Sequence, residues 1–421
     1  MTRVLVLATT TGYQTRMFGE AAARLGVELV FATDRCDHLD DPWADGAIAV
    51  RFHDEGPSAD AIVRALEGRP INGVLALGDR PTVLAARVAE LLGLPGHPPD
   101  AAAAARDKRT SRARLGAAGL PTPAGFAVPI TRDPASLLPQ VPFPCVVKPA
   151  ALSGSRGVIR ADTPDAFVAA FGRVRRLLES PDIQALRDPL ADIIQVESYI
   201  DGDEYAVEGV LEHGVLRVLA IFDKPVPLVG PFFEETVYVT PSQAGAGRQQ
   251  AIRHAVGAAV DALGLRHGPV HAECRVSGDL VFVLEVAARP IGGLCARALR
   301  FTDPGGAAAG LEEVLLRHAT GESLDGWRRE EAASGVMMIP IPRGGVYRHV
   351  AGVDDALQVD GVDEVRVTAK PDQRLVPLPE GASYLGFIFA RGAAPDDVVR
   401  ALDAAHARLH FTIDPELPVM A

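Results

Sequence analysis

The sequence predicts an α/β fold at the N-terminal end of the chain and α+β structure in the rest. Short apolar strands alternate with helices over residues 3–92, which is typical of βαβ units and a parallel sheet. From residue 120 the strands follow one another through tight turns, and at residue 335 the pattern resets to a last set of strands and helices. With 421 residues, the chain exceeds one typical core, so we expect two to four subdomains of roughly 100 to 150 residues each.

Composition argues against several classes of protein. The formal net charge is −12 without any basic block, which disfavours nucleic acid or an anionic membrane as the main partner. No apolar run is long enough to span a membrane and residues 1–3 lead directly into a strand, so we predict neither a membrane span nor a signal peptide and expect a cytoplasmic protein. The four cysteines lack CxxC spacing, which favours buried thiols in a reducing compartment over zinc ligands or disulfides; they are Cys36, Cys145, Cys274 and Cys295.

The N-terminal region is interpreted as a scaffold. Its expected strands are 3–9, 28–31, 47–50 and 73–77, and its expected helices are 18–25, 59–66 and 82–92. The loops at residues 9–12 and 77–80 follow strand ends, where open α/β sheets place ligands. No GxGxxG motif is present, so a dinucleotide site is not supported. We favour a region that lends one wall to a site over one that takes a direct part in catalysis.

A lysine followed by small residues marks a candidate phosphate site. Residues 101–120 are expected to form one Ala-rich helix ending at Gly119. Residues 143–149 then form a short strand that carries Lys148, and residues 153–158 read SGSRGV. Free backbone N–H groups near an ammonium offset phosphate charge, although GxxxxGK[ST] is absent. A flexible hairpin is the alternative, and it explains the lysine less well.

The next segments offer ligands for the rest of a nucleotide. After a helix near 167–178, residues 192–208 read as a strand, a tight turn and a second strand. Glu204 after the turn is placed to accept hydrogen bonds from a ribose, and the backbone from Glu197 to Ile200 to pair with an adenine edge. Acids beside a turn are equally explained as solvated groups. A strand at 216–222, a polar and aromatic insertion at 230–240 and a helix at 254–263 follow.

Residues 271–293 form the hairpin around which the chain is organised. On its first strand, a period of two puts His271, Glu273 and Arg275 on one face. On its second strand, Val281, Val283 and Glu285 likewise share one face. If the connecting loop has an odd number of residues, the two acids face each other and need a cation, for which Mg²⁺ is the natural candidate. Arg289 and the loop 290–293, with free N–H groups, then suit an anion. The alternative is the solvated face of an ordinary hairpin with a plain turn.

The C-terminal region is expected to be a compact α+β domain of its own. A helix at 307–318 and a polar linker at 321–331 lead into it. Its expected strands are 336–341, 346–349, 362–367, 382–391 and 411–413, with helical segments at 354–357 and 395–409. Lysine is also scarce, since only four of the 42 basic residues are lysines: Lys108, Lys148, Lys224 and Lys370. Where only a positive charge is needed, this sequence uses arginine. A position that keeps lysine is therefore expected to be one where the compact ammonium group is required.

Taken in order, the motifs DK, PCVVKP, LSGSRGV, ESYIDGDEY, HAEC and LEVAARPIGG make the chain resemble the ATP-grasp carboxylate-amine ligases over residues 3 to about 300. The segment GVMMIPIPRGGVYRHVAGVDDAL is similar to the C-terminal domain of the L-amino acid ligases that form dipeptides. The resemblance implies an ATP-grasp fold with a Rossmann-like parallel-sheet domain at 1–105, an ATP-grasp domain at 106–320 and a small α+β domain at 330–421. Within the second, it implies a nucleotide lid at about 120–200 and a metal-binding sheet at about 200–300.

The resemblance also assigns roles to residues. It implies that ATP is bound by Lys108, Lys148, Ser153, Gly154, Ser155, Gly157, Glu197, Tyr199, Ile200 and Glu204. It implies that Mg²⁺, or Mn²⁺ in its place, is held by Glu273 and Glu285, and that the substrates contact His271, Arg289, Gly292 and Gly293. Lys148 and Arg289 would be catalytic, with Arg289 on the acyl phosphate. Many family members carry Asn where this chain has Ala287, which leaves a second metal one ligand short and resembles the dipeptide-forming branch.

The implied activity is ATP-dependent amide formation. A carboxylate, expected to belong to an amino acid, attacks the γ-phosphate of ATP, and an amine then takes the acyl phosphate to give an amide or dipeptide, ADP and phosphate. Partners are therefore small molecules, and a homodimer is compatible with the sequence. The alternatives are an ATP-grasp enzyme of the nucleotide-biosynthesis or carboxylase type with a different acid, and a nucleotide-binding module without turnover. The intact Glu273, Glu285 and Arg289 argue against the last.

Overall fold

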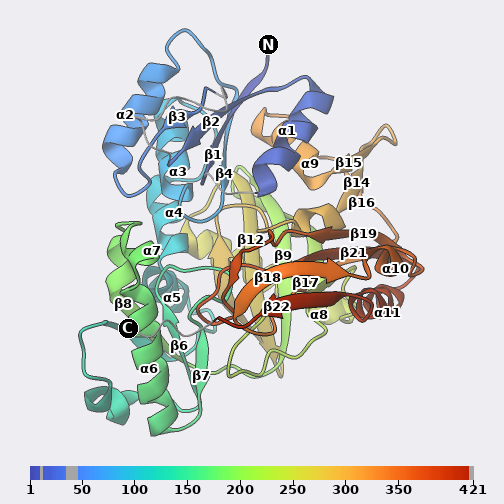
Figure 1. Ribbon diagram of the computed structural model, residues 1–421. Helices are drawn as coiled ribbons and strands as arrows, with labels where there is room; N and C mark the ends of the chain where they lie inside the picture. Colours follow the sequence, from blue (N-terminus) through green and yellow to red (C-terminus); the bar gives the residue numbers. More distant parts are fainter. Residues whose placement is uncertain (10–12, 35–45, 417–421) are drawn as a thin grey trace.

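The computed structural model describes residues 1–9, 13–34 and 46–416. Figure 1 shows three regions: an N-terminal region at the top, a small sheet with α6 at the lower left, and a large sheet at the lower right. Cys36 and residues 10–12 of the first predicted ligand loop lie outside the described residues. Among the described helices, none has the length and apolar character that a bilayer crossing requires.

The N-terminal region is the expected parallel sheet. Its strand order is β3-β2-β1-β4, and both partners of β1 run parallel to it. The strands are β1 (Arg3–Ala8), β2 (Glu28–Thr33), β3 (Ile48–Ala49) and β4 (Gly73–Leu77), and the helices are α1 (Tyr13–Leu25), α2 (Glu55–Ala65) and α3 (Thr82–Leu91). β1 is apolar after Arg3 and buried, as expected for a strand covered on both faces. The alternating pattern thus predicted this region correctly.

The Ala-rich segment forms two helices, so the expectation of a single helix over 101–120 was wrong. The helices are α4 (Pro99–Arg106) and α5 (Lys108–Ala117). Asp107 between them has extended backbone, and its side chain accepts hydrogen bonds from the N–H of Arg109 (3.0 Å) and the hydroxyl of Thr110 (2.8 Å). An aspartate in this position starts a new helix. The break makes Lys108 the first residue of α5, and its Nζ donates to the carbonyl of Leu152 (2.9 Å) beside the cleft.

A four-stranded antiparallel sheet carries the glycine-rich loop. Its order is β5-β8-β6-β7, and the strands are β5 (Gly125–Pro129), β6 (Cys145–Pro149), β7 (Ile159–Ala161) and β8 (Ile193–Ser198). α6 (Pro164–Leu178) packs on it through the buried rings of Phe167 and Phe171. Two short segments and one turn of helix complete it: η1 (Pro134–Gln140), α7 (Pro181–Gln184) and η2 (Pro189–Asp192). We call this unit the lid region and residues 153–157 the lid loop.

An eight-stranded sheet joins the middle of the chain to its C-terminal part. Its order is β13-β12-β9-β10-β11-β17-β21-β19. The strands are β9 (Asp203–Glu212), β10 (Val215–Asp223), β11 (Val237–Thr240), β12 (Gly268–Ser277), β13 (Leu280–Ala287), β17 (Ala333–Ile339), β19 (Val362–Val367) and β21 (Gly386–Gly392). α8 (Ala246–Leu263) covers one face, and α11 (Pro395–His406) packs on β17 and β21. β17 pairs with β11, so strands from the C-terminal part of the chain continue the central sheet. The sequence pattern did not indicate that one sheet would contain strands from both parts.

Smaller elements complete the C-terminal half. A three-stranded sheet contains β18 (Gly345–Ala351), β20 (Arg374–Leu375) and β22 (His410–Asp414), and α10 (Val353–Leu357) follows β18. A second contains β14 (Arg300–Thr302), β15 (Ala308–Gly310) and β16 (Arg328–Arg329), beside η3 (Cys295–Ala298) and α9 (Leu311–Ala319). The helix expected from residue 307 therefore starts at Leu311, because residues 308–310 pair as β15, and the expected linker contains β16. The proposed domain boundaries stay predictions.

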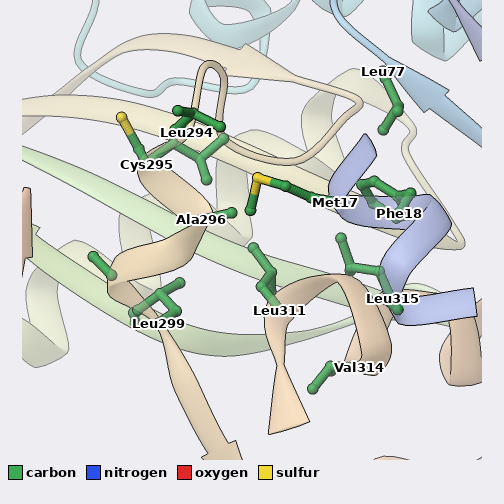
Figure 2. Packing of buried hydrophobic residues seen from close by; sticks show 14 of the residues in the cluster. Met17, Phe18, Leu77, Leu294, Cys295, Ala296, Leu299, Leu311, Val314 and Leu315 are labelled. Carbon is green, nitrogen blue, oxygen red and sulfur yellow. The ribbon is translucent and has the colours of Figure 1, made fainter. Parts of the chain in front are cut away.

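One apolar cluster joins the N-terminal region to the central sheet. Met17 and Phe18 of α1 pack with Leu311 and Leu315 of α9 and with Leu294, as Figure 2 shows. The same cluster includes residues of β9, β10 and β17. Leu75 and Leu77 of β4 belong to the same cluster, so this packing ties β4 to the central sheet. Within the described residues Cys145, Cys274 and Cys295 are buried free thiols, as predicted.

Candidate active site

The predicted site residues converge on one cleft between the lid region and the central sheet. Thirteen of them line it: Lys108, Lys148, Ser153, Gly154, Ser155, Glu197, Tyr199, Ile200, Glu204, His271, Glu273, Glu285 and Arg289. Gly157, Gly292 and Gly293 do not line it. Leu152, Phe233, Glu235, Arg275 and Leu284 complete much of the remaining wall. The thirteen predicted residues come from four separate stretches of sequence, which the fold brings together.

A β-bulge sets the two hairpin acids opposite each other. The turn between β12 and β13 has two residues, Gly278 and Asp279, and regular pairing from it would place Leu284 across from Glu273. The register shifts after Cys274↔Val283, and the next pair is Glu273↔Glu285. Bulges near active sites re-aim side chains in this way. The odd-length loop that the sequence argument required is therefore absent, and the extra residue Leu284 supplies the shift instead.

Because of the bulge, the side chains of β13 do not lie on the faces that were predicted for them. Val281 and Val283 pack against α8 in an apolar cluster, whereas Leu284 and Glu285 both line the cleft. The expectation that Val281, Val283 and Glu285 share a face was wrong, because it assumed an unbroken period of two. On β12 the expectation was correct, since His271, Glu273 and Arg275 all line the cleft.

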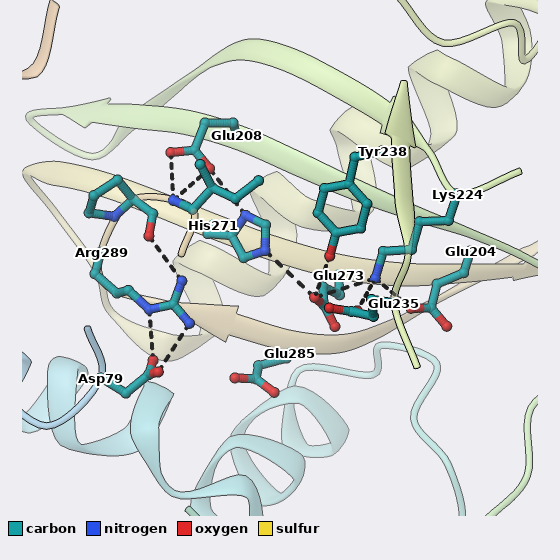
Figure 3. Close-up of polar contacts among 12 residues, drawn as sticks. Asp79, Glu204, Glu208, Lys224, Glu235, Tyr238, His271, Glu273, Glu285 and Arg289 are labelled. Atoms are coloured by element: carbon teal, nitrogen blue, oxygen red, sulfur yellow. Dashed lines mark hydrogen bonds and ion pairs between the residues drawn. The ribbon is translucent and has the colours of Figure 1, made fainter. Parts of the chain in front are cut away.

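The donor set on this wall suits a magnesium ion. Glu285 lies with its carboxylate in the cleft (Figure 3), is 27% exposed and has Lys108 Nζ at 3.4 Å. Glu273 belongs to a cluster in which one oxygen each of Glu204, Glu235 and Glu273 lie within 4.8 Å of one another. Two or three carboxylates with room for water and phosphate oxygens are the ligands that Mg²⁺ takes. The chemistry of these residues therefore fits the predicted metal.

Lys224 lies inside the acidic cluster. Its Nζ is 2.7 Å from Glu204 and 3.4 Å from Glu273, and it also contacts Glu235. Burial alone would lower the pKa of Lys224, but the three carboxylates outweigh it and hold that pKa well above its usual value. Burial and the Glu273 charge raise the pKa of Glu235 to about 7. Sequence reasoning missed Glu235, and the scarcity of lysine was the signal for Lys224.

The nucleotide end of the cleft contains a second set of paired charges. Lys148 Nζ is 2.6 Å from Glu197, and Arg112 Nε donates to the same carboxylate at 2.8 Å. Although burial opposes it, the two cations lower the pKa of Glu197 to about 2. The N–H groups of Ser198 and Tyr199 already donate to the carbonyls of Ala124 and Pro144, which directly precede β5 and β6. The carboxylate of Glu197 is thus engaged with cations, and its predicted part in adenine binding depends on the backbone.

Glu204 is also held by cations. Arg275 Nε donates to its Oε2 at 2.7 Å, opposite Lys224 on Oε1. Two further donors of Arg275 reach the carbonyls of Ile200 (2.7 Å) and Leu228 (2.6 Å). This arrangement fixes the carboxylate in the wall of the cleft, and its role on the ribose stays a prediction.

Arg289 is oriented by a residue of the N-terminal region. Its Nε and Nη2 donate to the two carboxylate oxygens of Asp79, each at 3.0 Å, and its Nη1 donates to the carbonyl of Pro290 (2.9 Å). Burial disfavours the charge of Arg289, but Asp79 outweighs it and raises the pKa of the guanidinium. Asp79 follows β4, in the loop 77–80 that was expected to lie where open α/β sheets place ligands, with no role predicted for Asp79 itself. The N-terminal region therefore contributes more than a passive wall.

A buried carboxylate supports His271. Glu208 is fully buried, lies 3.1 Å from His271 Nδ1, and accepts the N–H of Ile291 at 3.1 Å. Burial opposes a charged imidazole, yet Glu208 and Glu273 raise the pKa of His271 to about 9. The loop 290–293 was expected to offer free N–H groups to an anion, and for Ile291 this was wrong because Glu208 takes its N–H. Sequence reasoning missed Glu208.

Three family models match successive parts of the chain. They are the ATP-grasp N-terminal domain at 19–96, the ATP-grasp domain at 141–298 and the L-amino acid ligase C-terminal domain 2 at 337–414. The solved L-amino acid ligase from Bacillus licheniformis superposes with a TM-score of 0.82 at 26% identity, over 98% of this chain and 99% of that one. The chain belongs to the ATP-grasp carboxylate-amine ligases.

Curated relatives of this ligase are distant. A protein of Sinorhizobium fredii, uncharacterized protein y4rH, is 24% identical over 99% of the chain and 84% of its own length. The alanine–anticapsin ligase of Bacillus subtilis is 30% identical, but over 45% of the chain and 42% of its own length. The N5-carboxyaminoimidazole ribonucleotide synthetase of Thermotoga maritima has a TM-score of 0.68 at 14% identity and shares the fold.

Proposed function

We propose that this ATP-grasp ligase activates the carboxylate of an amino acid as an acyl phosphate and couples it to the amine of a second amino acid. The products are a dipeptide or related amide, ADP and phosphate. The observation that carries the proposal is the meeting of Lys108, Lys148, Glu273, Glu285 and Arg289 in one cleft of a chain with an L-amino acid ligase C-terminal domain. That domain argues against the nucleotide-biosynthesis and carboxylase types, whose structures share the fold at low identity.

In this proposal ATP lies between the lid loop and β12. Lys108 and Lys148 are compact ammonium groups near the floor of the cleft, and they would offset the charge of the triphosphate. Ser153, Gly154 and Ser155 of the lid loop would offer backbone N–H groups to the phosphates, while Glu204 would contact the ribose. Mg²⁺ or Mn²⁺ on Glu273 and Glu285 would neutralise phosphate charge and align the reacting oxygens.

The chain's own groups then govern the acyl transfer. Arg289, fixed by Asp79, presents its guanidinium where negative charge develops on the acyl oxygen. His271, held by Glu208, lies between this position and Glu273, where it contacts the substrates. The lid loop excludes water, which would otherwise hydrolyse the acyl phosphate.

The proposal is tested by mixing the protein with ATP, Mg²⁺ and pairs of amino acids, and measuring ADP release together with product mass. We expect ADP formation that depends on both amino acids, and a product whose mass equals their sum less one water. The Glu285→Gln variant is the control for contaminating activity. ADP release that depends on an acid outside the amino acids, without an amide product, would contradict the proposal. A homodimer and a cytoplasmic location stay predictions from the sequence.

A further inference from the structure

The lid loop is contacted from outside the cleft by a segment more than 200 residues later in the chain. Ser153, Gly154 and Ser155 face the cleft, whereas the N–H of Gly157 donates to the carbonyl of Pro379 at 2.7 Å. Next to it, Arg156 Nε donates to the carbonyl of Glu380 at 2.8 Å. One end of the loop therefore takes part of its position from the C-terminal half of the protein.

The side chain of Glu380 extends this contact to the helix behind the loop. Arg173 of α6 forms a two-pronged ion pair with the Glu380 carboxylate, with Nη2 to Oε2 at 2.9 Å and Nε to Oε1 as the second contact. The guanidinium also lies over the ring of Phe232, 4.8 Å from its centroid. The same residue thus contacts the lid loop through its backbone and α6 through its side chain.

The segment that presents Glu380 is a tight turn, residues 377–381, which we call the C-terminal turn. The N–H of Gly381 donates to the carbonyl of Pro377 at 2.9 Å, and a Cβ on Gly381 would lie 1.9 Å from the carbonyl oxygen of Val376. Only glycine fits that approach. β20 directly precedes the turn and pairs with β18, so the turn is anchored in the small C-terminal sheet.

We propose that the C-terminal turn positions the lid loop over the nucleotide and that Glu380 is a positioning residue for the reaction. The inference rests on the proposed function, because a closed lid matters only while an acyl phosphate must be kept from water. A loop of small residues loses much conformational freedom when it is ordered, and contacts that hold it in place beforehand reduce that loss on binding.

The geometry limits the size of the effect. Arg173 is 39% and Glu380 is 35% exposed, so their ion pair is screened by solvent and adds modestly to the two backbone contacts. Loss of the pair should therefore loosen the lid and not abolish turnover. A loosened lid wastes ATP, because water reaches the acyl phosphate before the amine does.

The first test measures the lid directly, by hydrogen exchange of amides 153–157 in the full chain with ATP and Mg²⁺ and without amino acids. We expect Glu380→Arg, which faces Arg173 with a like charge, to exchange about threefold to tenfold faster than the parent. The double variant Arg173→Glu with Glu380→Arg re-forms the pair and should return exchange to the parent rate. Glu322→Arg is the matched control. It reverses the charge of an exposed acid that pairs with Arg317 at 2.8 Å, and this pair is outside the lid region.

The second test measures ADP formed per amide bond with the substrates of the parent. We expect the ratio to rise in Glu380→Arg, with a raised KM for ATP and a smaller change in kcat, and to recover in the double variant. Equal lid exchange in Glu380→Arg and the parent, with ATP bound by both, would overturn the positioning role and leave the proposed function standing. Absence of ATP binding by the parent in calorimetry would overturn both.

Discussion

Removal of Arg289 separates the formation of the acyl phosphate from the binding of ATP. The guanidinium is paired with Asp79, whereas Lys148 is paired with Glu197. We expect Arg289→Ala to bind ATP with nearly unchanged affinity and to form product at least about a hundredfold more slowly, because one lost oxyanion donor typically costs about 3 to 4 kcal/mol.

The structure adds a cost in stability. Arg289 and Asp79 are 10% and 17% exposed, and they form two hydrogen bonds of 3.0 Å. Opposite charges about 4 Å apart attract by about 4 kcal/mol at an effective dielectric constant near 20. Desolvation offsets part of that attraction, but removal of one partner leaves the other buried and typically costs about 3 to 5 kcal/mol. Arg289→Ala should therefore lower the free energy of unfolding by an amount in that range.

A double-mutant cycle distinguishes the two effects. Asp79→Ala with Arg289→Ala removes the stranded carboxylate, so thermal or urea unfolding should show most of the stability regained while ADP formation stays slow. Calorimetry with ATP and Mg²⁺ checks that both variants still bind the nucleotide. Near-normal turnover in Arg289→Ala would refute the catalytic role, and lost ATP affinity would place Arg289 at the wrong end of the cleft.

Three further predictions concern charge and pH. Glu285→Gln should abolish ADP formation and weaken Mn²⁺ binding, measured by electron paramagnetic resonance, without a large change in Tm, because it removes metal charge and little volume. Lys148→Arg should weaken ATP binding at least about tenfold in calorimetry, since a planar guanidinium does not fit a compact site 2.6 Å from Glu197; equal activity would contradict the phosphate role. Burial lowers the pKa of His97 and of His318 to about 4. Below pH 6.5 the unfolded chain therefore binds more protons at these two residues than the folded chain does. Their contribution to stability is present above pH 6.5 and is lost as pH falls towards 4, on the order of 3 kcal/mol each, and urea unfolding of His318→Gln should show a shallower loss.

The sequence predicted the elements and the line of motifs because both depend on local patterns. β4 and β19 have the predicted bounds, since β4 is an apolar run that ends before Gly78 and β19 is a valine-rich segment that begins after Gly361. Asp107 is a local signal for the break before α5, but the run of alanines before it favours one continuous helix. The bulge at Leu284 had no such signal, because residues 280–287 read as one continuous strand and the shift appears only in their pairing with β12.

Contacts between distant segments were outside the reach of sequence patterns. Asp79 and Arg289 are 210 residues apart, and Arg173 and Glu380 are 207 residues apart. Each pair depends on how whole regions pack, and no periodicity or spacing in one segment encodes its partner in another. Glu208 was missed for a related reason: it reads as an acid in an apolar strand, and only burial beside His271 gives it a role.

The lysines connect these observations. Lys108, Lys148 and Lys224 are buried and each contacts a carboxylate of the cleft, whereas Lys370 is exposed elsewhere. On the proposed function, a triphosphate draws Lys108 towards its oxygens and away from Glu285. That carboxylate then lacks a cation in a partly buried site, so it favours a divalent ion. We therefore expect ATP and Mg²⁺ to bind with positive coupling, which follows from an ammonium group that can leave one partner for another.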